Sequence, residues 1–148
     1  MICNACPRRC GAERTEYSPG GICACPCLPL VARAAPHYGE EPCISGERGS
    51  GTVFFSGCNL RCVFCQNHEI SRSKLGKTVS VERLADIFLE LQDKGVHNIN
   101  LVTPTHYTDA IVAALERAKL RIPVAWNSSG YDSVESLKKL EGLVRIYM

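Results

Sequence analysis

Three cysteines in one short loop constrain this chain more than any other feature. Cys58, Cys62 and Cys65 have a Cys-x3-Cys-x2-Cys spacing and directly follow the apolar run Thr52–Phe55. Three thiolates within eight residues can surround one metal centre, and Gly57 tolerates the tight turn that such a loop needs. Four thiolates would close a tetrahedral site, whereas three leave one position open for chemistry. The sequence therefore predicts a zinc or iron–sulfur centre at this loop.

The residues around the loop resemble a known signature. With Phe64 directly before the last cysteine, the motif is similar to that of radical S-adenosylmethionine (SAM) enzymes. The longer string Gly49–Asn67 resembles an uncharacterised branch related to pyruvate formate-lyase activating enzymes, and the resemblance covers the whole chain. It implies that the three cysteines hold a [4Fe-4S] cluster and that the amino and carboxylate groups of SAM chelate the fourth iron. The alternative is a structural zinc site completed by Cys43 or His68.

Residues 1–46 are interpreted as a separate Cys-rich segment. A Cys-x2-Cys-x3-Cys motif opens it and further cysteines follow, a pattern suited to zinc or to a second iron–sulfur cluster. The predicted ligands of this second metal centre are Cys3, Cys6, Cys10 and Cys23. Cys25 and Cys27 could equally supply the fourth thiolate, and Cys23 is chosen because the resemblance aligns a Gly-x-Cys there. A segment this short cannot bury its own core, so a metal would stabilise it; the alternative is a loose tail with reduced thiols.

Composition narrows the classes of function. The 148-residue chain carries a net charge of +2 and ten cysteines. It has no basic run interleaved with aromatic residues, so we expect no nucleic-acid partner, and no apolar run reaches ~18 residues, so we expect no membrane span. Because the N-terminus also lacks a signal-peptide pattern, we predict a cytoplasmic protein whose cysteines bind metal rather than form disulfides. The resemblance also implies oxygen sensitivity and an anaerobic way of life.

From residue 51 onward the pattern alternates between strands and helices. Apolar, β-branched and aromatic runs predict four strands, at Thr52–Ser56, Asn98–Thr103, Pro123–Ser128 and Leu143–Tyr147. Apolar residues spaced three and four apart predict three helices, which begin after the N-cap residues Ser80, Thr108 and Ser133. The first of these helices is expected to span Val81–Lys94. Upstream, Leu30–Ala35 is predicted as a short strand or extended arm, and Pro36–Gly46 as a loop.

Repeated strand–helix units with short connections favour right-handed crossovers and a parallel sheet, and therefore an α/β fold. The resemblance implies a partial (β/α)6 barrel. We expect residues 47–148 to form the N-terminal part of that barrel, incomplete at the C-terminus. Because the chain ends inside the fourth predicted strand, one sheet edge would lie open and the 148 residues would be a fragment.

In parallel α/β folds, ligands gather at the carboxyl ends of the strands. Besides the cysteine loop, two such ends carry short hydroxyl and amide side chains, at Thr103–His106 and Asn127–Gly130. These side chains could hydrogen-bond a ribose or an amino acid, or could simply form turns. The candidate SAM-binding residues are Phe64, Gln66, Thr103, Thr105, Asn127 and Ser129. For Phe64 and Gln66 this rests on the resemblance, in which the backbone there lies by the adenine.

The chain departs from the family pattern after the second predicted strand. Many radical SAM enzymes carry Gly-Gly-Glu at this point, whereas this chain has Thr103-Pro104-Thr105. Without the carboxylate, the SAM amino group would rely on backbone carbonyls or threonine hydroxyls. Neither His68 nor His106 is assigned a catalytic role, and Arg61 could either offset cluster charge or be solvated.

The leading hypothesis is a radical SAM enzyme that cleaves SAM reductively to a 5′-deoxyadenosyl radical, which abstracts hydrogen from an unknown substrate. The resemblance implies a flavodoxin- or ferredoxin-like electron donor and suggests a glycyl-radical enzyme as protein substrate. The alternative is a non-catalytic zinc or iron–sulfur binding module. A thiol–disulfide function for Cys3 and Cys6 is disfavoured, because the pair does not follow a strand at the start of a helix.

Overall fold

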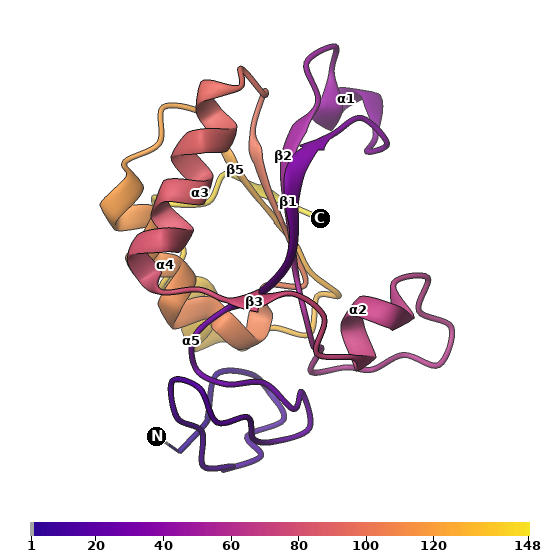
Figure 1. The fold of residues 1–148 in the computed structure, drawn as a ribbon, viewed down its shortest axis with the longest axis vertical. Coiled ribbons are helices and arrows are strands. Elements are labelled where there is room, and N and C mark those ends of the chain that lie inside the picture. Colours follow the sequence, from indigo (N-terminus) through magenta and orange to yellow (C-terminus); the bar gives the residue numbers. More distant parts are fainter. Residues whose placement is uncertain (1) are drawn as a thin grey trace.

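A single mixed sheet organises the protein. The computed structural model describes residues 2–148, and its six strands lie in the order β3-β1-β2-β4-β5-β6 (Figure 1). Four of them are mutually parallel: β2 (Ser50–Phe55), β4 (Ile99–Val102), β5 (Val124–Asn127) and β6 (Ile146–Tyr147). The remaining two extend the sheet on one side, β1 (Leu30–His37) running antiparallel to both β2 and β3 (Lys77–Thr78). The sheet is therefore mostly parallel, which is consistent with the partial barrel that the sequence resemblance implies.

A helix lies between each pair of consecutive strands along the chain. The helices are α1 (Pro42–Ser45), α2 (His68–Arg72), α3 (Val81–Asp93), the 3-10 turn η1 (Thr105–Tyr107), α4 (Thr108–Ala118) and α5 (Val134–Lys138). Figure 1 shows α3 and α4 side by side along one face of the sheet. Among residues 2–148, none of these helices combines the length and apolarity that crossing a bilayer requires.

The core lies between that helical layer and the sheet. The sheet contributes alternate residues of its strands, among them Val53, Phe55, Leu101 and Trp126. The helices contribute the apolar stripes predicted from their spacing, among them Leu84, Phe88, Ile111 and Leu115. All eight side chains are at most 4% exposed, so this layer is close-packed and provides a firm base for the loops at the strand ends.

Most of the predicted elements are confirmed, with shifted boundaries. The strand at Leu30–Ala35 extends to His37, and the hydroxyls of Ser80 and Ser133 accept backbone N–H groups at the starts of α3 and α5. The predicted N-cap at Thr108 is wrong, because Thr108 is the first helical residue and donates its hydroxyl to the Thr105 carbonyl at 2.8 Å. The loop predicted at Pro36–Gly46 is wrong in part, since it includes the end of β1 and the short helix α1.

The N-terminal segment lies at the end of the sheet where the parallel strands finish. Figure 1 shows its coils, in indigo, at the same end of the molecule as α2. Strand β1, which falls within the predicted first region, pairs with β2 in the common sheet. The division at residue 46 stays a prediction.

Candidate metal and cofactor site

The cysteine loop leaves the carboxyl end of β2 and returns to the sheet through α2. Its two ends meet where the Gly57 backbone N–H donates to the Ile70 carbonyl at 3.1 Å. Gly57 has φ +77°, a left-handed conformation that glycine adopts without steric cost. Arg61, between the first two cysteines, also has a positive φ of +58°. The segment from 57 to 70 is therefore a closed loop at the strand end, where ligands bind in parallel folds.

The three loop cysteines are half-buried, free thiols. Cys58 Sγ lies 3.4 Å from the Leu60 backbone N–H, which donates to it, and the Ser71 hydroxyl donates to Cys65 Sγ at 3.5 Å. Across residues 2–148, no three His, Cys, Asp or Glu side chains are arranged as a set that could hold a metal ion. The loop thus supplies three thiols of the right kind on one short segment, but their sulfurs are not gathered into a ligand set.

Three arginines form hydrogen bonds at the loop, and two of them contact its backbone. Arg8, from the N-terminal segment, donates to the carbonyls of Asn59 and Leu60, the second at 3.3 Å. Arg72, on α2, donates to the Cys62 carbonyl at 2.8 Å. The loop's own Arg61 reaches back to the Ile22 carbonyl at 3.3 Å. The guanidinium groups of Arg8 and Arg72, always charged, thus lie on the loop backbone and would offset part of the negative charge of a thiolate-bound centre, while Arg61 ties the loop to the N-terminal segment.

A second strand end also holds the loop. Asn59 is only 3% exposed, and its side-chain Nδ2 donates at 3.1 Å to the carbonyl of Tyr131, in the loop after β5. This contact and those from Arg8 and Arg72 had no detectable pattern in the sequence, because each depends on how the chain folds around the loop. Only Arg61, which lies between the cysteines, was open to sequence reasoning.

The residues predicted to contact SAM differ in exposure. Phe64 is 86% exposed, and Gln66 and Ser129 are also exposed. Asn127 and Thr103 are half-buried neighbours, joined by a 3.0 Å bond from the Thr103 amide to the Asn127 carbonyl. Thr103 has φ +59°, a conformation unusual for a residue other than glycine. The remaining residue, Thr105, is 2% exposed. These six assignments stay predictions.

The four predicted ligands of the second metal centre differ in the same way. Cys3 and Cys6 are buried, Cys10 is exposed and Cys23 is half-buried. A hydrogen bond from the nearby Cys25 thiol, together with the positive charge of Arg14, lowers the pKa of Cys23 below its usual range, although burial opposes that shift. Within the described chain these thiols form no ligand set, so the second centre also stays a prediction.

A buried arginine fastens the N-terminal segment to the strand ends. Arg14 is 3% exposed and donates to Cys3 Sγ at 3.2 Å, to the Pro26 carbonyl, and to the His106 carbonyl at 3.4 Å. Its guanidinium carbon lies 5.9 Å from the centre of the Tyr107 ring, within cation–π range. A buried charge is tolerated because these partners satisfy it, so the contact is specific rather than incidental.

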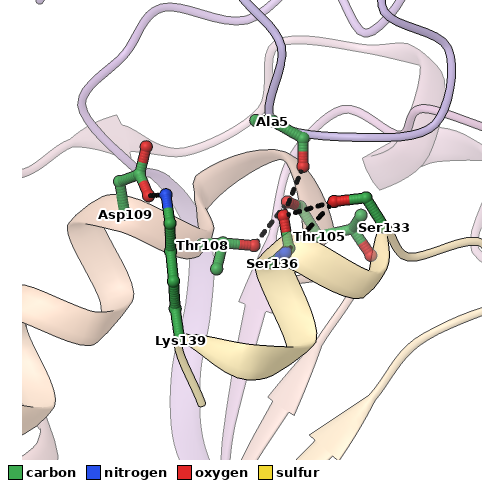
Figure 2. A network of polar contacts seen from close by, with 7 residues as sticks. All are labelled: Ala5, Thr105, Thr108, Asp109, Ser133, Ser136 and Lys139. Atoms are coloured by element: carbon green, nitrogen blue, oxygen red, sulfur yellow. Dashed lines mark hydrogen bonds and ion pairs between the residues drawn. The ribbon is translucent and has the colours of Figure 1, made fainter.

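Helix α5 holds the same segment from the other side. Figure 2 shows the Ser136 hydroxyl donating to the Ala5 carbonyl at 2.9 Å, next to the Ser133 hydroxyl. In the same view Lys139, directly after α5, and Asp109, on α4, form a 2.5 Å ion pair. A cavity of about 230 Å³ remains between the N-terminal segment and these two helices.

Comparison with known proteins gives the family. Residues 52–148 match the model of the radical SAM superfamily. The chain is also 33% identical, over 155 aligned positions, to an uncharacterized protein of the archaeon Methanocaldococcus jannaschii. That alignment includes 99% of this chain and 44% of the relative, so the chain spans less than half the relative's length. No solved structure matches significantly. With the family match beginning inside β2 and including the whole cysteine loop, this chain belongs to the radical SAM superfamily.

Proposed function

We propose that the protein is a radical SAM enzyme whose [4Fe-4S] cluster is held by Cys58, Cys62 and Cys65. The observation that carries this proposal is the loop itself: three free thiols at the carboxyl end of the first parallel strand, with the side chains of Arg8 and Arg72 on its backbone. Thiolates are the usual ligands of iron–sulfur clusters, and three of them leave one iron open. The family match supports the same conclusion.

The bound cluster would supply reductive cleavage of SAM to methionine and a 5′-deoxyadenosyl radical, which removes hydrogen from a substrate. The protein's part is to bind and orient. The three thiols would be drawn together within one loop that is already closed at its base by the Gly57–Ile70 bond. Asn127 and Thr103, joined at neighbouring strand ends, would hydrogen-bond the SAM molecule beside that loop.

The finer assignments extend this proposal. We infer a flavodoxin- or ferredoxin-like electron donor, for which the 86% exposed Phe64 at the loop tip offers an accessible apolar contact. A glycyl-radical enzyme as substrate rests on the sequence resemblance to activating enzymes alone. A second centre at the N-terminal cysteines, either zinc or iron–sulfur, is supported by four free thiols on one segment.

The test is anaerobic reconstitution with iron and sulfide, followed by electron paramagnetic resonance of the reduced protein with and without SAM. We expect a [4Fe-4S] signal that changes when SAM is added, and the loss of that change in Cys58→Ala. The matched control is Cys43→Ala, which removes an exposed thiol outside both sets and should behave as the wild type. A SAM-dependent signal that persists in Cys58→Ala would refute the assignment.

The second candidate is a non-catalytic metal-binding module. It is supported by one observation, the further free thiols of Cys3, Cys6, Cys10 and Cys23, which SAM cleavage at the loop would not use. In the same experiment, zinc uptake without a cluster, or a cluster that is indifferent to SAM, would support this module over the enzyme.

A further inference from the structure

The peptide unit that joins Ser56 to Gly57 is held from three directions. The Ser56 carbonyl oxygen lies 2.9 Å from His106 Nε2 and 3.4 Å from Cys25 Sγ. On the other side of the same peptide, the Gly57 N–H donates to the Ile70 carbonyl. The contacts come from η1, from the N-terminal segment and from α2. Because Cys58 is the next residue, this peptide fixes the point at which the cysteine loop begins.

The contact with the N-terminal segment is close. A β-carbon at Gly57 would lie 2.1 Å from Cys25 Sγ and 2.8 Å from the Cys23 carbonyl oxygen, so glycine is needed for space as well as for its φ. Cys25 itself is 1% exposed, and its single thiol proton is shared between the Cys23 carbonyl, 3.1 Å away, and the Ser56 carbonyl. The N-terminal segment therefore packs directly against the base of the loop.

The imidazole of His106 is held in place by its own surroundings. Because a carbonyl oxygen only accepts hydrogen bonds, Nε2 must carry the proton that is donated to Ser56. The ring packs against Tyr107 with 4.1 Å between the ring centres, and Arg14 donates to the His106 backbone carbonyl. Burial lowers the pKa of His106 to about 4, so at neutral pH the ring is an uncharged donor that keeps this one orientation.

We propose that His106 and Cys25 are positioning residues for the metal centre, acting through the Ser56–Gly57 peptide. Neither side chain would touch the cluster. Together they hold the Ser56 carbonyl, so that the backbone leading into Cys58 is fixed and orients the Cys58 thiol. This inference rests on the proposed function at Cys58, Cys62 and Cys65. It also gives the N-terminal segment a role in the site that does not depend on a second metal.

The test compares the rate at which reconstituted protein loses its cluster to an iron chelator under anaerobic conditions. His106→Phe keeps a ring but removes the donor, and we expect about tenfold faster loss, as for one lost buried hydrogen bond. His106→Gln, whose amide can donate to the same carbonyl, should recover most of the difference. Cys25→Ala should also accelerate loss, and Cys25→Ser should not. The matched control is His97→Phe, just before the amino end of β4 and so at the other end of the strand from His106. This variant should leave the rate of cluster loss unchanged.

Two further readouts separate positioning from general stability. The g-values of the reduced cluster should change in His106→Phe but not in Phe88→Ala, whose deleted ring lies in the core between helices and sheet. In the metal-free protein, hydrogen exchange of a peptide spanning residues 52–66 should be faster in His106→Phe than in His97→Phe. Equal exchange, or equal cluster loss, in these two variants would overturn the inference. If the wild type binds no cluster, the proposed function fails, and the exchange comparison alone decides whether the peptide is held as described.

Discussion

Replacing Gly57 by alanine should destabilise the protein by more than the cost of placing alanine in a left-handed backbone conformation. At φ +77°, an alanine costs roughly 1–2 kcal/mol relative to glycine. The new methyl would also lie 2.1 Å from Cys25 Sγ, well inside van der Waals contact. Since both residues are buried and the nearby Cys23 carbonyl belongs to the backbone, the N-terminal turn would have to shift, which adds about 1–3 kcal/mol.

The total is about 2–5 kcal/mol, a large part of the about 5–15 kcal/mol that stabilises a typical domain. Thermal unfolding of the reduced, metal-free protein should show a melting temperature lower by about 5–15 °C. The control is Gly95→Ala, after α3, where φ is +81° and no atom lies within 4 Å of the added methyl, so that only the backbone cost applies. Adding Cys25→Ala to Gly57→Ala should recover part of the loss. Equal destabilisation by Gly57→Ala and Gly95→Ala would refute the close contact.

Three further predictions concern two buried side chains near the site and one helix cap. Burial lowers the folded-state pKa of His106 from 6.5 to about 4, so its contribution to stability is present above pH 6.5 and is lost as pH falls toward 4. Urea unfolding across this range should show the free energy of unfolding fall by an amount on the order of 3 kcal/mol, and this pH dependence should be absent in His106→Gln. Arg14→Met leaves the Pro26 carbonyl without this donor and should cost about 1–3 kcal/mol in urea unfolding, whereas no change would mean that the guanidinium is not buried as described. Ser80→Ala removes the N-cap bond to the Arg83 amide and should cost about 1 kcal/mol by the same assay, and a neutral result would contradict the cap.

Local patterns in the sequence were sufficient where the physics is local. Apolar residues at helical spacing give α3 its buried face, and Ser80 begins it as expected, because both effects act within a few residues. Thr108 shows the limit of such reasoning. A hydroxyl residue before an apolar run can cap a helix or lie within its first turn, and here the preceding turn η1 places it inside the helix. The strand β3 has only two residues, both exposed, and had no detectable pattern.

The cysteine loop and its position after an apolar strand were determined by the sequence alone, because a ligand spacing and a strand run are both written in consecutive residues. The tertiary structure decided what surrounds that loop. Arg8 and Cys25 approach it from the N-terminal segment and His106 from the end of β4, across separations of about 30 to 50 residues. Such contacts depend on how the strands pair and how the N-terminal segment folds over their ends. No local pattern encodes them, since hydrogen bonds and close packing between distant residues form only once the whole sheet has brought those residues together.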